Sequence, residues 1–254
     1  MAEVIKTATR DAYGKALVEL GEKNKNVVVL DADLAAATKT GAFKKAFPER
    51  FFDTGIAESN MMSLAGGLAT TGFTVFASTF AMFAAGRAFE QVRNTIGYPH
   101  LNVKIGATHA GISVGEDGAT HQCNEDIALM RTIPGMTIIN PADAAEARLA
   151  VKAAIDHQGP VYLRFGRLAV PVLFDKNSYK FELGKGAVLA DGNDVTIVAS
   201  GLTVGLALEA RELLANEGIS ARVINIHTIK PIDKDIILAA AADTGAIVTA
   251  EEHN

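Results

Sequence analysis

Cysteine, long apolar runs and excess positive charge are all scarce in this sequence of 254 residues. The single cysteine, Cys123, cannot build an internal disulfide framework and fits the reducing environment of the cytoplasm. No stretch of about 20 apolar residues occurs, and the first residues lack the apolar core of a signal peptide, so we expect no membrane span. The net charge of −5 argues against a nucleic-acid groove as the main binding surface. Neither paired CxxC motifs nor HExxH is present, so the sequence predicts no metal site of its own.

Short apolar runs alternate with helical patterns through the first two thirds of the chain. With 49% hydrophobic residues and 23 glycines, the chain is globular. A helix is predicted from residue 6, and the strands and helices that follow alternate, which is typical of a parallel sheet with helices on both faces. The predicted strands are 26–31, 73–78, 101–108, 136–140 and 161–165, and the later helices are 41–47, 58–69, 79–97, 124–132 and 142–157.

Residues 169–193 interrupt this rhythm with prolines, glycines and asparagines and are predicted to be a linker. A second α/β unit follows, with strands at 194–200, 221–226 and 246–250 and helices at 203–217 and 232–242. We therefore expect domains at 1–180 and 181–254. Three strands leave an open edge, so we expect the second domain to be incomplete.

The stretch from Asp53 to Ala69 places one carboxylate, Glu58, in the opening turn of a helix that is apolar on nearly every side. Such a helix is expected to be buried. The first turn carries unpaired N–H groups and the positive end of the helix dipole, so Glu58 can serve simply to stabilise the start of the helix. Alternatively, it is a buried acid aimed at the ring nitrogen of a ligand.

A glycine-rich loop after the strand at 101–108 gathers His109, Glu116, Asp117 and His121. Two histidines and two carboxylates on one loop can contact substrate hydroxyls and move protons near neutral pH. A solvated loop with histidines bonded to the backbone is the plain alternative. A metal site fits less well, because the spacing of the two histidines matches no compact ligand motif.

Each of the other candidate binding residues is a weaker signal when it is taken alone. Phe80 and Phe83, three apart on a predicted helix, could form an aromatic wall for a flat ring, although such pairs usually belong to the core. Three arginines are candidate phosphate ligands, although isolated arginines mostly form surface ion pairs. They are Arg10, Arg164 and Arg167. Asp31 and Asp33 could bind a metal, but a loop cap is favoured.

Taken together, these segments resemble the C-terminal subunit of a split transketolase, an enzyme family that uses thiamine diphosphate. The resemblance covers essentially the whole chain, and its most specific parts are residues 53–58, 78–83 and 115–122. It implies a pyrimidine-binding domain over 1–180 and a truncated transketolase C-terminal domain over 181–254. A separate N-terminal partner subunit would supply the magnesium–diphosphate site, whose glycine-rich motif is not found here. The resemblance thus implies a chain that is inactive alone and assembles as a dimer of heterodimers.

Roles at the cofactor also follow from the resemblance. Glu58 matches the glutamate that hydrogen-bonds the aminopyrimidine nitrogen and activates the cofactor. Phe80 and Phe83 match the pyrimidine pocket, and Asp33 matches an aspartate near the cofactor rings.

At the substrate, His109 and His121 match histidines that contact donor and acceptor hydroxyls and take part in catalysis. Asp117 matches the aspartate that reads the hydroxyl beside the carbonyl. Arg10 and Arg164 match arginines that hold the sugar phosphate, with Arg167 as a further candidate.

Two positions depart from the family pattern. Ala37 stands where many transketolases have a phosphate-binding serine, although Thr38 is adjacent, and Gly86 stands where an aromatic residue often completes the pyrimidine pocket. These changes bear on phosphate affinity and pocket shape.

The expected activity is transfer of a two-carbon ketol unit from a ketose phosphate to an aldose phosphate, a cytoplasmic reaction of the pentose phosphate pathway. Deoxyxylulose-phosphate synthase and the pyruvate dehydrogenase β-subunit share the cofactor helix, but His109 argues against the first, and the set His109, Asp117 and His121 against the second. A non-catalytic binding subunit is a further alternative. A nicotinamide oxidoreductase is disfavoured because the loop 201–205 lacks the G-x-G-x-x-G fingerprint.

Overall fold

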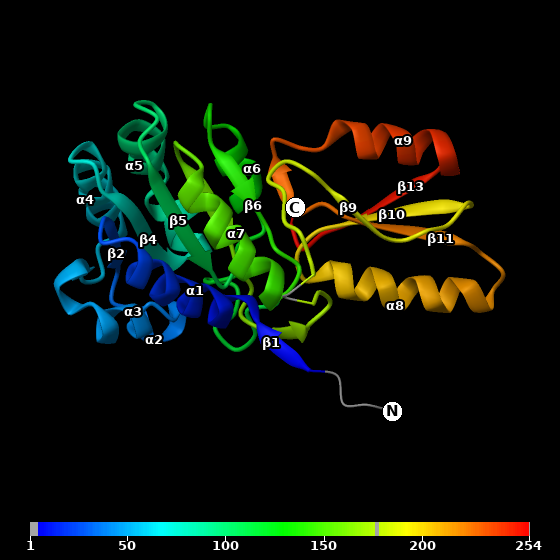
Figure 1. Cartoon of the computed structure of the whole chain (residues 1–254), viewed down its shortest axis with the longest axis horizontal. Coiled ribbons are helices and arrows are strands. Elements are labelled where there is room, and N and C mark those ends of the chain that lie inside the picture. The colour runs from blue at the N-terminus through cyan, green and yellow to red at the C-terminus, as the bar shows by residue number, and fades with distance from the viewer. Residues whose placement is uncertain (1–4, 176–177, 254) are drawn as a thin grey trace.

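A computed structural model describes residues 5–175 and 178–253, which form an α/β protein with two main sheets (Figure 1). The larger sheet has seven strands in the order β12-β6-β7-β5-β4-β2-β3, with β12 antiparallel to the rest. The strands are β2 (Val27–Asp31), β3 (Phe51–Asp53), β4 (Thr74–Phe80), β5 (Val103–Thr108), β6 (Thr137–Ile139), β7 (Val161–Arg164) and β12 (Thr228–Lys230). Every residue of β2 and β5 is buried, as their unbroken apolar runs predict.

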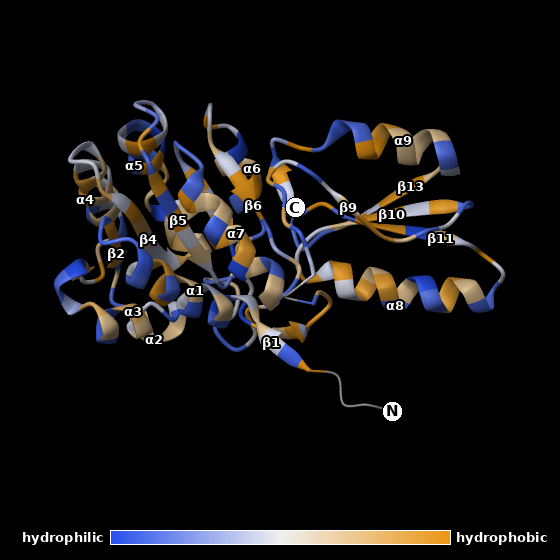
Figure 2. Ribbon diagram, in the orientation of Figure 1, coloured by the Kyte–Doolittle hydropathy of each residue, from blue (hydrophilic) through white to orange (hydrophobic). Residues whose placement is uncertain are grey.

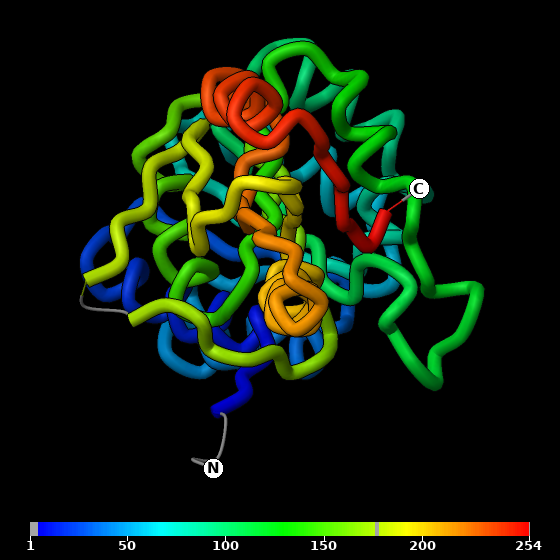
Figure 3. Tube along the Cα trace, turned by 90° about the vertical axis from the view of Figure 1, so that its right-hand side faces the viewer, coloured from blue at the N-terminus to red at the C-terminus, as the bar shows by residue number. Residues whose placement is uncertain are grey.

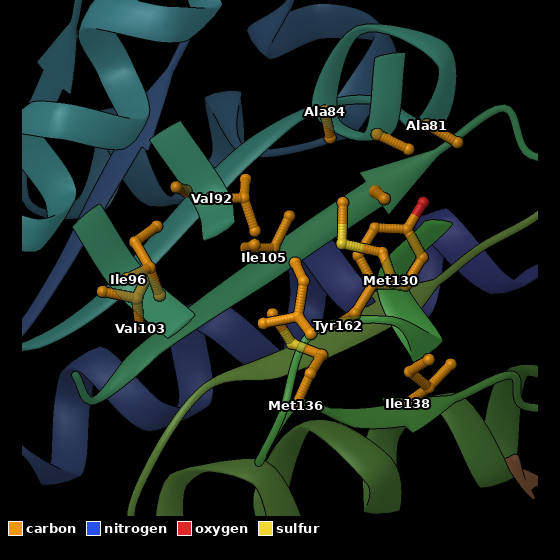
Figure 4. Packing of buried hydrophobic residues seen from close by; sticks show 14 of the residues in the cluster. Ala81, Ala84, Val92, Ile96, Val103, Ile105, Met130, Met136, Ile138 and Tyr162 are labelled. Carbon is orange, nitrogen blue, oxygen red and sulfur yellow. The ribbon is translucent and has the colours of Figure 1, made fainter. Parts of the chain in front are cut away.

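Helices cover both faces of this sheet. On one face lie α1 (Thr9–Lys23) and α7 (Ala144–Asp156). The other face is covered by α4 (Glu58–Thr70), η2 (Phe83–Arg87), α5 (Phe89–Gln91), η3 (Val92–Gly97) and α6 (Asp126–Arg131). Figure 4 shows part of the core on this second face, where Val92 of η3 lies beside Ile105 of β5 and Ile96 of η3 lies beside Val103. Short helical turns α2 (Ala35–Thr38), α3 (Gly41–Ala46) and η1 (Pro48–Arg50) connect β2 to β3.

The smaller sheet has the order β13-β10-β11-β9. Its strands are β9 (Ala187–Ala190), β10 (Val195–Ala199), β11 (Ala221–Asn225) and β13 (Ile247–Ala250), and α8 (Thr203–Asn216) and α9 (Lys234–Thr244) lie on opposite sides of it (Figure 1). Figure 2 shows hydrophobic and hydrophilic residues mixed along α8, as expected for a helix with one face on a sheet. The predicted fold class is confirmed: a parallel α/β sheet precedes a second α/β unit.

Several predicted element boundaries were wrong. Residues 6–8 are not helical but form β1 (Lys6–Ala8), which pairs with β8 (Ala169–Pro171). The predicted linker therefore contains β8 and also β9, the antiparallel edge strand that makes the smaller sheet four-stranded. These strands are short and need distant partners, so local patterns do not reveal them. In addition, β12 crosses back to pair with β6 of the larger sheet. The domain boundary at 180/181 stays a prediction.

The region around Phe80 also differs from the prediction. Thr79 and Phe80 do not begin a helix, because β4 continues to Phe80, which pairs with Thr108 of β5. The β-favouring residues and an available partner strand explain the longer strand. Phe80 and Phe83 thus lie on different elements. The helical stretch that follows is interrupted, with π-helical turns in η2 and η3.

Helix α4 is only partly buried, contrary to the prediction. Met61, Met62 and Ala65 face the core, whereas Leu64 is 40% exposed and Ile56, just before the helix, is 77% exposed. An apolar composition therefore does not bury every side of this helix in the single chain. Among the helices of the described residues, none is long and apolar enough to cross a membrane.

Candidate active site

The predicted site residues collect at the carboxyl ends of the central parallel strands. β4 ends at Phe80, β5 ends at Thr108 immediately before His109, and β2 ends at Asp31. In open parallel sheets this edge is where ligands bind.

Glu58 is the first residue of α4, as predicted, and its side chain is only 1% exposed. Arg87, at the end of η2, donates to both carboxylate oxygens, with Nη1 3.1 Å from Oε2 and 3.3 Å from Oε1. The Arg87 side chain is 54% exposed, and its guanidinium lies 4.8 Å from the centre of the Phe83 ring. Sequence reasoning missed Arg87. The signal available was an arginine four residues after Phe83, which is close to one helical turn.

Phe80, Phe83 and the two loop histidines form one aromatic cluster. The rings of Phe80 and Phe83 stack with centroids 5.7 Å apart and an interplanar angle of 15°. His109 stacks on Phe80 at 3.8 Å, and His121 meets Phe83 edge-on at 5.3 Å. The structure therefore joins the predicted aromatic wall to the predicted histidine loop, although the two phenylalanines share no helix.

His109 is held as a neutral imidazole. It has a left-handed backbone (φ 60°), and 2% of the residue is exposed. Arg10 Nη1 lies 3.1 Å from Nε2, and Thr108 Oγ1 lies 2.9 Å from Nδ1. Since an arginine can only donate, Nε2 accepts and Nδ1 carries the proton. Burial, followed by the nearby charges of Arg10 and Arg167, lowers the pKa of His109 to about 3.

Two of the three candidate arginines influence this histidine: Arg10 contacts it, and Arg167 lowers its pKa electrostatically. Arg10 Nη1 also donates to the Ala37 carbonyl at 3.0 Å, and its buried Nε has no hydrogen-bond partner among the described residues. Arg167 pairs with Glu116, and its Nε lies 3.8 Å from Asp117. Both arginines contribute to the positive potential at His109. An unpartnered guanidinium N–H next to a second arginine suits an anionic group.

Arg164 is placed differently. It is 3% exposed, its Nε donates to Asp126 at 2.9 Å, and its Nη2 donates to the Glu252 carbonyl at 2.8 Å. Tyr162 donates to the same oxygen of Asp126. These contacts make Arg164 part of the buried framework, whereas Arg167 acts electrostatically on both Arg10 and His109. The phosphate-binding role of Arg164 stays a prediction.

The two aspartates at and just after the end of β2 differ in their surroundings. Asp31 is buried and accepts hydrogen bonds from the Leu34 N–H and from the hydroxyls of Thr38 and Thr40, so it caps the loop. Burial raises its pKa. Asp33 is exposed, has a φ of 61°, and its N–H donates to Asp53.

The arrangement fits an aminopyrimidine ring. A flat heterocycle needs an aromatic surface, and Phe80 and Phe83 supply one. A ring nitrogen can bond a carboxyl group that is shielded from water, and the buried Glu58 is linked to Phe83 through Arg87, which contacts both. Neutral His109 can bond a hydroxyl, and Arg10 and Arg167 can bind an anion.

Comparisons with known proteins agree with this reading. The transketolase pyrimidine-binding domain family matches residues 5–172, and the transketolase C-terminal domain family matches residues 184–254. The chain belongs to the transketolase family, which depends on thiamine diphosphate, and the predicted resemblance is confirmed.

Three similar proteins illustrate the relationship. A protein of Methanocaldococcus jannaschii named "Putative transketolase C-terminal section" is 51% identical over 96% of this chain and 77% of its own length. The 6-deoxy-6-sulfo-D-fructose transketolase subunit SqwH of a Clostridium species is 44% identical over 95% of this chain and 75% of its own. A solved split-gene transketolase, described as an inactive β4 tetramer, has a TM-score of 0.90 and 58% identity, covering 97% of this chain and 80% of its own. Each of these three names describes a section, a subunit or a split-gene form of a transketolase.

Proposed function

We propose that this chain is the catalytic C-terminal subunit of a two-subunit transketolase that moves a two-carbon ketol unit from a ketose phosphate to an aldose phosphate. The observation that carries the proposal is the continuity of the site. Arg87 connects the buried Glu58 to Phe83, Phe83 stacks on Phe80, Phe80 stacks on the neutral His109, and His109 contacts Arg10.

Glu58, Phe80 and Phe83 would hold the pyrimidine half of the cofactor. When bound, thiamine diphosphate supplies the nucleophilic carbon that takes up the ketol unit. Glu58 would hold or share a proton at the ring nitrogen, for which Arg87 must release the carboxylate. The stacked phenylalanines would orient the ring, and we place Asp33 at the rim of this pocket, since it is exposed at the end of β2.

The polar groups beyond the stack would bind the sugar. His109 stays neutral near pH 7 with Nε2 as an acceptor, so its role would be to accept a hydrogen bond from a substrate hydroxyl in place of Arg10 rather than to act as a strong base. His121 faces the same ring stack and is half-buried, and it would contact a second hydroxyl of the sugar. Asp117 would read a hydroxyl, and Arg10 with Arg167 would bind the terminal phosphate. We propose Arg167 in place of Arg164 for this role because Arg164 is already paired with the buried Asp126.

The N-terminal partner subunit is also part of the proposal. We infer that the partner binds magnesium and the diphosphate and that the active form is a dimer of heterodimers in the cytoplasm. Two similarities support a partner: one relative is named as a subunit, and the similar solved structure made of β chains is described as inactive. The pentose phosphate pathway is the expected setting.

Reconstitution tests the proposal directly. The chain is mixed with its N-terminal partner, thiamine diphosphate and magnesium, and assayed with xylulose 5-phosphate and ribose 5-phosphate. We expect ketol transfer from the mixture and none from either subunit alone. Turnover of pyruvate without turnover of sugars would instead identify a synthase or dehydrogenase-type enzyme. Cofactor binding without turnover of any of these substrates would favour a non-catalytic subunit.

A further inference from the structure

The loop that carries His109, Asp117 and His121 is closed at its base by a short pairing. Gly111 N–H donates to the Cys123 carbonyl at 2.9 Å, and Cys123 N–H donates back to Gly111 at 3.2 Å. Beyond this base much of the loop is exposed, including Ile112 at 59%. Its backbone therefore needs further support to hold its side chains in one geometry.

One such support comes from the other end of the chain. Glu252 follows β13 of the smaller sheet, and only 8% of the residue is exposed. Its Oε1 accepts the main-chain N–H of Ser113 at 2.5 Å, across 139 positions of sequence. Figure 3 shows the C-terminal segment, in red, ending beside a green part of the chain. The residues that follow the smaller sheet thus contact the loop of the candidate active site.

The fit at this contact is close. Gly111 has a φ of 82°, and a Cβ atom built on it would lie 2.2 Å from Cδ of Glu252. A side chain at Gly111 would therefore collide with the Glu252 carboxylate as well as strain the backbone.

The main chain of the tail is anchored independently of this carboxylate. Arg164 donates to the Glu252 carbonyl at 2.8 Å, and the Ala128 N–H donates to Nε2 of His253 at 3.0 Å. Arg164 is fixed in turn by Asp126. A change in the Glu252 side chain consequently removes the bond to Ser113 while the tail keeps its two other attachments.

We propose that Glu252 is a positioning residue that sets the geometry of the substrate loop. By accepting the Ser113 N–H, its carboxylate fixes the segment between His109 and Asp117. This hydrogen bond satisfies a backbone donor that the loop itself leaves open. The smaller sheet acquires a role in substrate recognition in this way. The catalytic part of this inference rests on the proposed function, whereas the anchoring of the loop does not.

Three variants of the full chain test the role. Glu252→Ala removes the acceptor, Glu252→Gln keeps an oxygen that can accept the same N–H, and Glu251→Ala removes the exposed neighbouring carboxylate as a control. In the reconstituted enzyme we expect Glu252→Ala to lower kcat/KM for sugars by about tenfold or more, because small misplacements of substrate-binding groups are costly. Thiamine diphosphate affinity should be unchanged. Glu252→Gln should stay within about twofold of wild type, as should Glu251→Ala.

Hydrogen exchange of the loop gives a readout that needs no activity. Amides of residues 110–122 should exchange faster in Glu252→Ala than in wild type, with the Ser113 amide most affected, while Glu252→Gln retains protection. If Glu252→Ala does not fold, Glu252→Asp replaces it, since the shorter side chain withdraws the carboxylate but keeps the charge.

The outcomes separate the two ideas. Unchanged loop exchange in Glu252→Ala overturns the positioning role, and so does an equal loss of kcat/KM in the alanine and glutamine variants. Faster loop exchange in a chain whose wild type transfers no ketol unit supports the anchoring and overturns the proposed function.

Discussion

Replacing Glu58 by glutamine separates its structural role from its chemical one. Glutamine has nearly the same shape, but it cannot form the ion pair with Arg87 or exchange a proton with a ring nitrogen. Since the Arg87 side chain is 54% exposed, water can take over its bonds, and the pair contributes only about 1 kcal/mol. The carboxylate itself is 1% exposed, and its burial costs the folded state free energy that a neutral amide avoids in part.

These two effects oppose each other, so we expect Glu58→Gln to change the free energy of unfolding by no more than about 1 kcal/mol. Turnover in the reconstituted enzyme should fall by about 100- to 10,000-fold, the range associated with a positioned acid–base group. Urea denaturation of the isolated chain measures the first quantity, and the sugar assay measures the second.

Arg87→Gln is the matched control, because it removes the ion pair and keeps the carboxylate. It should retain far more activity than Glu58→Gln. Wild-type turnover in Glu58→Gln would refute the assignment of this acid. A loss of more than about 3 kcal/mol in both variants would show instead that the ion pair is a structural element.

Three further predictions concern other ionisable side chains. Burial raises the pKa of Glu146 to about 7, above its value in the unfolded chain. The folded state therefore gains stability as pH falls from about 7 to about 4.5. Glu146→Gln should remove this pH dependence of the thermal unfolding temperature. Burial and nearby arginines lower the pKa of His109 to about 3, so its ring resonances should show no titration between about pH 5 and pH 8 in NMR, and an inflection there would contradict the neutral assignment. Arg164→Met should destabilise the chain by about 3–5 kcal/mol, because Asp126 is left buried without its cation. Arg167→Met should leave stability nearly unchanged and raise the KM for phosphorylated sugars. The reverse pattern would restore Arg164 as the phosphate ligand.

Much of the candidate site could be predicted from local sequence, but its connections could not. Glu58 at the start of a helix and the histidine loop after a buried strand both follow from short-range patterns. Phe80 was expected beside Phe83 for the wrong reason, since β4 extends to Phe80 and the two rings meet across elements. Arg87 and Glu252 were missed because the groups they contact are 29 and 139 positions away in sequence.

The sequence by itself determined the α/β class, the buried central strands and the helix that begins at Glu58, because apolar periodicity and helix-start chemistry act over a few neighbouring residues. Only the tertiary structure decided which charges pair. In the folded chain Arg164 is buried against Asp126, and Arg167 acts electrostatically on His109. Glu252, two residues after β13, contacts the loop that follows His109. Such pairings depend on how the sheet edges and the two sheets meet in space, and an arginine or glutamate has the same local pattern whether its partner is water, a ligand or a distant backbone N–H.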